Sequence, residues 1–274
     1  MEDIRIAAVT CRCPAGEVDR NLETAAAWVE KAADRGAAIV CFPELNISGY
    51  CLEAATCRAA AGRYGDIVSR LSALAAASGI VILAGTVAEE DTGNRFFARH
   101  LVFFPDGSPA VYTKLHIAPP EKKLFVPGQD IPLFNVKGAV LGIGLCYDAH
   151  FPELATCMAA RGADILFFPH ASPRGTSAEK LASWMRHLPA RAYDNTVFVA
   201  ACNQCGENGA GLEFPGVAVA LDPSGGVLAT ATAPDTMIIA DLSAAMLETV
   251  RRHPMRYFLP GRRPDLYGSS GRDQ

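Results

Sequence analysis

The sequence has few charged residues and no concentration of one sign. Only 20% of its 274 residues are charged, the formal net charge is -4, and no segment gathers lysine and arginine into a basic face. A protein that follows phosphates or an anionic membrane surface needs such a face. We therefore expect neither a nucleic acid nor a membrane as partner.

A long apolar run is also lacking. The most apolar stretch, ALAAASGIVILAG, is interrupted by Ser78 and Gly79 and is too short to span a bilayer. The first residues, MEDIRIAAVTCRC, begin with two acids and pass directly into an apolar alternation, unlike a secretion signal. These features predict a soluble, cytoplasmic protein.

The cysteines lack the pattern of a secreted disulfide framework. They number nine, which is odd, and most lie inside apolar strand or helix patterns of a long chain. Half of the residues are hydrophobic, which is enough for one large core. We expect a single domain over residues 1–274.

Strand-like and helix-like segments alternate along the chain. A strand at 4–10 precedes a helix at 21–36, with Asn21 as its cap, and a buried strand at 37–42 follows. The turn PDGS at 105–108 predicts a hairpin, and the pattern at 177–195 predicts one continuous helix. This alternation is typical of an α/β fold.

A weak internal repeat divides the chain into two halves. GAAIVCFPEL at 36–45 matches GADILFFPHA at 162–171, and each has a glycine that ends a helix, a buried strand and a polar residue at the strand end. Strands this apolar must be covered on both faces. We expect two sheets packed face to face beneath outer helices.

Three strand ends carry side chains that could react together. Glu44, Lys114 and Cys146 each follow a short apolar strand, where α/β folds place their functional groups. Taken singly, such residues are more often a loop acid, a surface lysine and a packing cysteine. Together they supply a thiol nucleophile, a base and an electrostatic helper.

The surrounding blocks make the interpretation specific. CFPELNISGY, YTKLHIAPPEKKLFVPG and GLCYDAHFPE resemble the signature blocks of the nitrilase superfamily of carbon-nitrogen hydrolases, and the resemblance extends to FPGVAVALDPSGGVLA and RRPDLYG. It implies that Glu44, Lys114 and Cys146 are the catalytic residues, with Glu121 as a further glutamate beside them. It also implies a four-layer α-β-β-α sandwich, a homodimer or larger homo-oligomer, and no metal or other cofactor.

Amide hydrolysis requires these residue types. An amide is a poor electrophile with a poor leaving group, so a thiolate must attack, the oxyanion must be held and the departing amine needs a proton. Glu44 would move the protons, while Lys114 and the backbone N–H of Tyr147 would stabilise the oxyanion. Glu121 would position the substrate or tune Glu44.

The leading prediction is a thiol amidohydrolase that releases ammonia from a small linear amide. The block CYD resembles the amidase and carbamoylase branches, so an N-carbamoyl amine or amino acid amidohydrolase is the close alternative and a nitrilase the third. A different class is a metal or redox protein built on four thiols, and a binding scaffold without activity is a further alternative. The four thiols are Cys11, Cys13, Cys202 and Cys205.

Residues near the nucleophile suggest how a substrate is selected. Arg174, in the loop HASPRGTSAEK, is predicted to bind a substrate carboxylate with help from His150, and the alternative for Arg174 is a solvated loop residue. Asp148 is interpreted as a turn acid rather than a second base. Glu153 is expected to pair with Arg191.

Overall fold

The computed structural model describes residues 1–91, 93 and 95–267, and the last residue of the RRPDLYG block, Gly268, lies outside this part. Most strands belong to two six-stranded sheets, and β10 (Gly206–Glu207) pairs separately with β11 (Glu213–Phe214). The first sheet has the order β14-β1-β2-β3-β4-β5, formed by Thr236–Leu242, Ile4–Thr10, Ile39–Cys41, Val81–Glu89, Phe96–Phe103 and Ala110–Thr113. The second has the order β13-β12-β9-β8-β7-β6, formed by Val227–Ala231, Ala218–Leu221, Phe198–Asn203, Ile165–His170, Ala139–Ile143 and Leu133–Val136.

The two sheets have the same internal plan. In the first, β1, β2 and β3 are parallel, and β4, β5 and β14 run antiparallel to their neighbours. In the second, β7, β8 and β9 are parallel, and β12, β13 and β6 are antiparallel. The repeated segments of the sequence therefore occupy equivalent central strands, β2 and β8.

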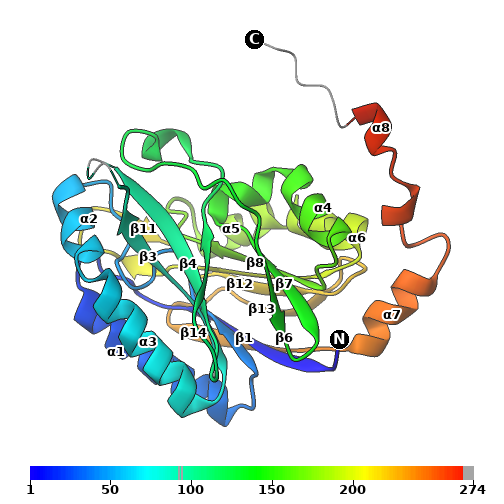
Figure 1. Cartoon of the computed structure of the whole chain (residues 1–274), viewed down its shortest axis with the longest axis horizontal. Coiled ribbons are helices and arrows are strands. Elements are labelled where there is room, and N and C mark those ends of the chain that lie inside the picture. Colours follow the sequence, from blue (N-terminus) through cyan, green and yellow to red (C-terminus); the bar gives the residue numbers. More distant parts are fainter. Residues whose placement is uncertain (92, 94, 268–274) are drawn as a thin grey trace.

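Helices cover the outer face of each sheet (Figure 1). The first sheet carries α1 (Val18–Asp34), α2 (Ala54–Ala61) and α3 (Tyr64–Ser78). The second carries α4 (Pro152–Ala160), α5 (Ser177–Trp184) and α6 (Leu188–Asn195). After α7 (Ala244–Arg252), the chain runs away from the sheets to α8 (Pro264–Tyr267).

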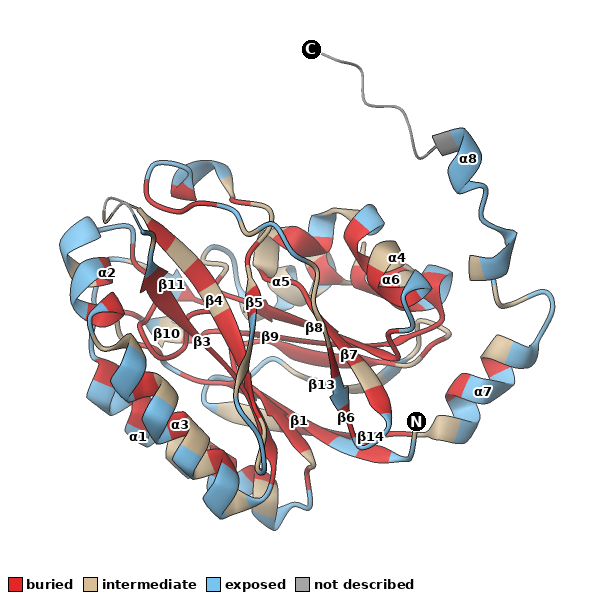
Figure 2. Ribbon diagram, viewed as in Figure 1, coloured by how far each residue is buried: buried red, intermediate tan, exposed pale blue. Residues whose placement is uncertain are grey.

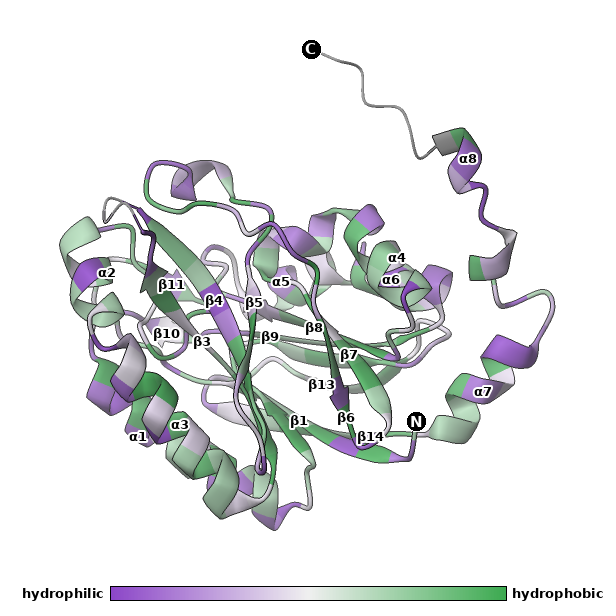
Figure 3. Ribbon diagram, in the orientation of Figure 1, coloured by the Kyte–Doolittle hydropathy of each residue, from purple (hydrophilic) through white to green (hydrophobic). Residues whose placement is uncertain are grey.

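The sequence of β8 shows why this stacking is stable. Ile165 and Phe167 pack into the core between the sheets, whereas Leu166 and Phe168 pack beneath the helices of the second sheet. Alternate side chains of a strand point to opposite faces, so an unbroken apolar run buries both faces. Buried apolar strands accordingly lie between helices with exposed polar outer faces (Figures 2 and 3), and the predicted four-layer sandwich is confirmed.

The expected hairpin is present, but two helix predictions are wrong. β4 and β5 pair antiparallel around the predicted turn. α1 begins at Val18, so Asn21 lies inside it, and its buried Nδ2 donates to the carbonyl oxygens of Pro14 (2.8 Å) and Ile47 (2.9 Å). The segment 177–195 forms two helices because Pro189, which has no N–H to continue a helix, lies in the first turn of α6.

The sequence analysis missed β14, which pairs with β1 along its full length. In the part of the chain that the structure describes, no helix is long and apolar enough to cross a membrane.

Candidate active site

Glu44 is held in a tight turn after β2. Leu45 has a left-handed backbone (φ 53°), and a Cβ added to Gly85 of β3 would lie 2.7 Å from the Leu45 nitrogen. Only glycine permits this close approach. The Gly85 N–H donates to Asn46 Oδ1 (2.8 Å), and the Gln204 amide donates to the Glu44 carbonyl oxygen (2.8 Å). The backbone at fully buried Glu44 is thus fixed from two sides.

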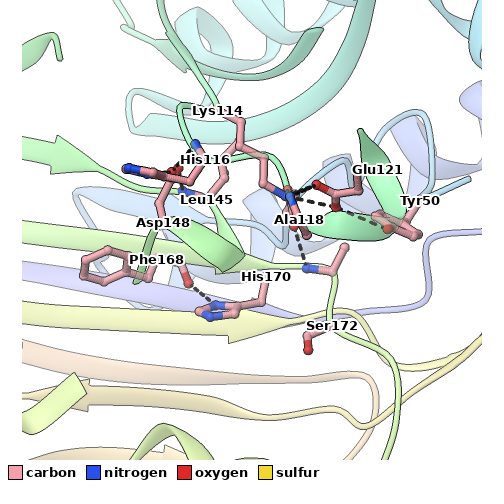
Figure 4. A network of polar contacts seen from close by, with 12 residues as sticks. Tyr50, Lys114, His116, Ala118, Glu121, Leu145, Asp148, Phe168, His170 and Ser172 are labelled. Carbon is pink, nitrogen blue, oxygen red and sulfur yellow. Dashed lines mark hydrogen bonds and ion pairs between the residues drawn. The ribbon is translucent and has the colours of Figure 1, made fainter. Parts of the chain in front are cut away.

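Lys114 directly follows β5 and lies between two carboxylates. Its Nζ is 2.8 Å from Glu44 Oε1, and 3.0 and 2.9 Å from the two oxygens of Glu121 (Figure 4). Lys114 is 1% exposed. A buried ammonium is tolerated only with such partners, because its loss of hydration is large.

Glu121 lies in the short 3-10 helix Pro119–Glu121, and its carboxylate is anchored independently of Lys114. Tyr50 donates its hydroxyl to Oε1 (3.2 Å), and the Ala118 N–H donates to Oε2 (3.0 Å). These bonds hold the Glu121 carboxylate against the ammonium. Glu121 is therefore a fixed part of the cluster and not a solvated loop acid.

Cys146 follows β7 in a strained backbone conformation. Its φ of 46° places a residue other than glycine in the left-handed region, and it opens the 3-10 helix Cys146–His150. Such strain persists only where the surroundings determine it, and it is frequent at functional sites. Cys146 and Tyr147 are partly exposed, whereas Glu44 and Lys114 are buried. A substrate can therefore approach from the side of the thiol.

Asp148 holds this turn in place. Its Oδ2 accepts from the Leu145 N–H (2.8 Å) and from the Tyr112 hydroxyl (2.7 Å), and its Oδ1 lies 2.8 Å from the backbone nitrogen and 2.7 Å from Nδ1 of His116. The buried carboxylate thus joins the nucleophile turn to the segment that carries Lys114. These bonds agree with the interpretation of Asp148 as a turn acid.

Sequence reasoning missed three contacts of the two glutamates. The Ala171 N–H donates to Glu44 Oε2 (3.0 Å), while Tyr50 and Gln204 make the bonds described above. Only the internal repeat indicates in the sequence that Ala171 lies near the site. In that repeat, Ala171 after β8 corresponds to Leu45 after β2. Tyr50 and Gln204 lie in loops without a local pattern.

Burial controls the protonation of the cluster. Burial raises the pKa of Glu44 to about 7, opposed by the Lys114 charge and reinforced by Glu121. Burial disfavours the Lys114 ammonium, but Glu44, Cys146 and Glu121 outweigh it and raise the pKa of Lys114. Burial, followed by the charge of Glu44, raises the pKa of Cys146 in spite of Lys114. Cys146 therefore rests as a neutral thiol, and its proton must leave as it attacks.

The remaining predicted residues lie outside the buried cluster. Arg174 is exposed on a surface cavity of about 580 Å³ that Arg12 and Phe214 also line. His150 is exposed, with its ring centroid 4.7 Å from that of His187.

The expected pair of Glu153 and Arg191 is wrong. The Arg191 Nε donates to the Ala149 carbonyl oxygen (3.1 Å), and Glu153 is exposed and forms no ion pair with Arg191 in the described part of the chain, although its charge acts on the guanidinium.

The four thiols proposed for a metal or redox protein do lie near one another. Cys11 and Cys13 have their sulfurs 3.7 Å apart, and the Cys205 N–H donates to the Cys11 carbonyl oxygen. Within residues 1–91, 93 and 95–267, no three or more His, Cys, Asp or Glu side chains are placed to hold a metal ion. This geometry gives the metal alternative no support.

The sequence of the whole sandwich matches one family model. The model for carbon-nitrogen hydrolases matches residues 5–252. The chain belongs to the carbon-nitrogen hydrolase family. The resemblance drawn from the signature blocks is thereby confirmed, and this carbon-nitrogen hydrolase acts on C–N bonds other than peptide bonds.

Relatives of this carbon-nitrogen hydrolase include amidases. An omega-amidase of Mus musculus is 32% identical over 278 residues, covering 97% of this chain and 98% of its own, and one of Xenopus tropicalis is 32% identical over 258 residues, covering 90% and 91%. A nitrilase-superfamily amidase of Nesterenkonia has a similar structure, with a TM-score of 0.84, 28% identity, and coverage of 97% of this chain and 96% of its own.

Proposed function

We propose that this protein is a thiol amidohydrolase that releases ammonia from a small linear amide, with Cys146 as nucleophile. The observation that carries the proposal is the buried ion pair of Lys114 and Glu44, with Nζ 2.8 Å from Oε1, in one cluster with a partly exposed thiol. In this assignment Glu44 moves protons, Lys114 and the Tyr147 N–H bind the oxyanion, and Glu121 fixes the lysine.

The reaction proceeds in two halves. Cys146 gives its proton to Glu44 as sulfur attacks the carbonyl carbon, and Lys114 stabilises the negative oxygen. Glu44 then protonates the nitrogen, so the C–N bond breaks, ammonia leaves and a thioester remains. Glu44 next takes a proton from water, which attacks the thioester and releases a carboxylic acid, and the proton returns to the sulfur.

Relatives support amides as the substrate class. Two similar proteins are omega-amidases, and the Nesterenkonia amidase has been solved with butyramide and with an acetamide group covalently added at its active-site cysteine. N-carbamoyl compounds remain the second candidate and nitriles the third, because all three groups present an electrophilic carbon bonded to nitrogen.

A substrate panel tests this ranking. Purified protein is incubated with linear amides, N-carbamoyl amines or amino acids, and nitriles, and ammonia release is measured. We expect the highest kcat/KM for an amide. Turnover of nitriles alone would contradict the proposal.

A substrate carboxylate bound by Arg174, with His150, is a further part of the proposal. A guanidinium binds a carboxylate through two parallel hydrogen bonds. Replacing Arg174 with alanine should lower kcat/KM for acidic amides about tenfold or more, and should change that for neutral amides less. If the preference for the acid is unchanged, Arg174 is a solvated loop residue.

We also propose that residues 1–274 act as a single cytoplasmic domain in a homodimer or larger homo-oligomer. All nine cysteines are free thiols, which suits a reducing compartment. Tyr193 of α6 lies beside Phe258, with ring centroids 5.5 Å apart, and Met255 and Leu266 of the same C-terminal segment are exposed. A second subunit would cover such apolar side chains. Light scattering that gives a monomer mass would contradict the assembly.

A further inference from the structure

Lys180 of α5 is partly buried and has no anionic partner. Its Nζ donates to Ser172 Oγ (2.8 Å) and to the Pro173 carbonyl oxygen (3.2 Å), both of which are uncharged. Among the described residues, no carboxylate forms an ion pair with it. An ammonium has three protons, so one remains for another acceptor.

The contacts of the adjoining loop link Lys180 to the buried cluster, near enough for a charge on Cys146 to act on it. Ala171, whose N–H donates to Glu44 Oε2, also lowers the pKa of Cys146 through its backbone N–H. Ser172 is the next residue, about 3.8 Å away between Cα atoms, and it holds the Lys180 ammonium. A charge on Cys146 in turn raises the pKa of Lys180, against the effect of burial.

The loop that positions Lys180 is fixed. The Ser172 N–H donates to Asn203 Oδ1 (2.9 Å), and Asn203 Nδ2 donates to the Ser172 carbonyl oxygen (3.0 Å). Asn203 ends β9 of the second sheet and is fully buried. The ammonium, which comes from α5, is therefore held by a loop that is itself fixed to a strand end.

Apart from Cys146, the groups that act electrostatically on Lys180 and on His170 are basic side chains. Arg174 and Lys180 interact electrostatically, and His187, Lys180 and His150 all act on His170. Burial lowers the pKa of His187 to about 4, so its ring is neutral at pH 7, and its buried Nε2 has no partner in the described part of the chain. An anionic group would meet the attraction of the ammonium here, and the nearby Glu44 carboxylate is already paired with Lys114.

A partly buried ammonium without a counter-ion is costly, because hydration is lost and no ion pair replaces it. We propose that Lys180 is a specificity-determining residue that binds a carboxylate at the far end of the acyl chain while the amide carbon meets Cys146. This inference rests on the proposed amidase function. It places the contact of the carboxylate on Lys180, whereas Arg174 is exposed on the surface cavity that Arg12 and Phe214 line.

Two amides of equal chain length test the inference: succinamate, which carries a terminal carboxylate, and butyramide, which does not. The ratio of their kcat/KM values is measured for the wild-type protein and for Lys180→Met, Lys180→Arg and Arg174→Ala. Lys31→Met is the matched control, since Lys31 is exposed on α1, where it lies over Trp28. Glutaramate and valeramide repeat the comparison at one more carbon.

In Lys180→Met, the succinamate-to-butyramide ratio should fall about 10- to 100-fold, mainly through KM for succinamate, the range expected for a hydrogen bond to a charged group. Lys180→Arg should keep the ratio within about threefold, because the charge is retained, and Lys31→Met should leave it unchanged.

Other outcomes would overturn the inference. An equal loss on both amides in Lys180→Met would mean that Lys180 only supports the loop, and a ratio that falls only in Arg174→Ala would assign the carboxylate to Arg174. A wild-type protein that hydrolyses butyramide but neither acidic amide would remove the inference and leave the amidase function intact. Hydrolysis of no amide at all would instead contradict the proposed function.

Discussion

Replacing Cys146 with alanine should reduce kcat/KM for every amide by about 10⁴- to 10⁶-fold while leaving the fold intact, as for other enzymes that lose their nucleophile. No other group in the buried cluster can form the thioester. The substitution removes a single sulfur atom from a partly exposed residue, and alanine bears the same left-handed strain as cysteine at φ 46°. Ammonia release and thermal unfolding measure the two effects separately.

Cys157→Ala is the matched control for this experiment. Cys157 is also a partly exposed free thiol, but it lies on α4 and makes none of the hydrogen bonds described for Glu44 and Lys114. It should retain wild-type turnover. Activity near the wild-type value in the Cys146 variant would end the case for covalent catalysis.

Replacing Glu44 with glutamine should lower kcat by about 10²- to 10⁴-fold, the range typical of a lost general base. It should also remove a feature of the pH profile. The pKa of Glu44 is raised to about 7, so below pH 7 the carboxyl is mostly protonated and cannot take the thiol proton. Wild-type kcat/KM should therefore rise as the pH is raised through about 7. The residual kcat/KM of the variant should not show this rise.

The control for Glu44→Gln is Glu153→Gln, which removes an exposed carboxylate near the nucleophile turn. Glu153→Gln should keep both the wild-type kcat and the rise of kcat/KM with pH. A wild-type profile that is flat between pH 6 and 8, about one unit on either side of that pKa, would show that Glu44 is not the base that limits the reaction. Glu44→Gln should also unfold at a lower temperature. The two carboxylate oxygens accept from Lys114 and from the Ala171 N–H, whereas glutamine has only one side-chain oxygen.

The sequence was sufficient to predict that Glu44, Lys114 and Cys146 lie near one another, although not what each does. Each follows an apolar strand, and periodicity identifies such strands. Glu44 and Cys146 follow parallel strands of the two equivalent halves, and polar residues at carboxyl strand ends meet at one side of an α/β core. The repeat of 36–45 in 162–171 was similarly sufficient to indicate two related sheets.

Contacts between distant loops could not be predicted in this way. Gln204 and Glu44 are separated by 160 residues in the sequence, and Tyr50 and Glu121 by 71. Local periodicity therefore gives no signal for either contact. The same limit applies to Lys180, whose role depends on a loop geometry rather than on a motif. The cap assigned to Asn21 failed because α1 begins at Val18, so Asn21 lies inside the helix, where its Nδ2 donates to two carbonyl oxygens outside the helix.

The bonds of Asp148 have a consequence for the dynamics of the molecule. Tyr112 comes from the first sheet and Leu145 from the end of the second, so one buried carboxylate spans both. Ala171 and Glu44 form a similar connection between β8 and β2. The nucleophile turn cannot open by the fraying of a surface loop. We therefore expect the amide protons of Leu145 and Ala171 to exchange among the slowest in the protein, and core substitutions that loosen one sheet against the other to lower activity without contacting the reacting groups.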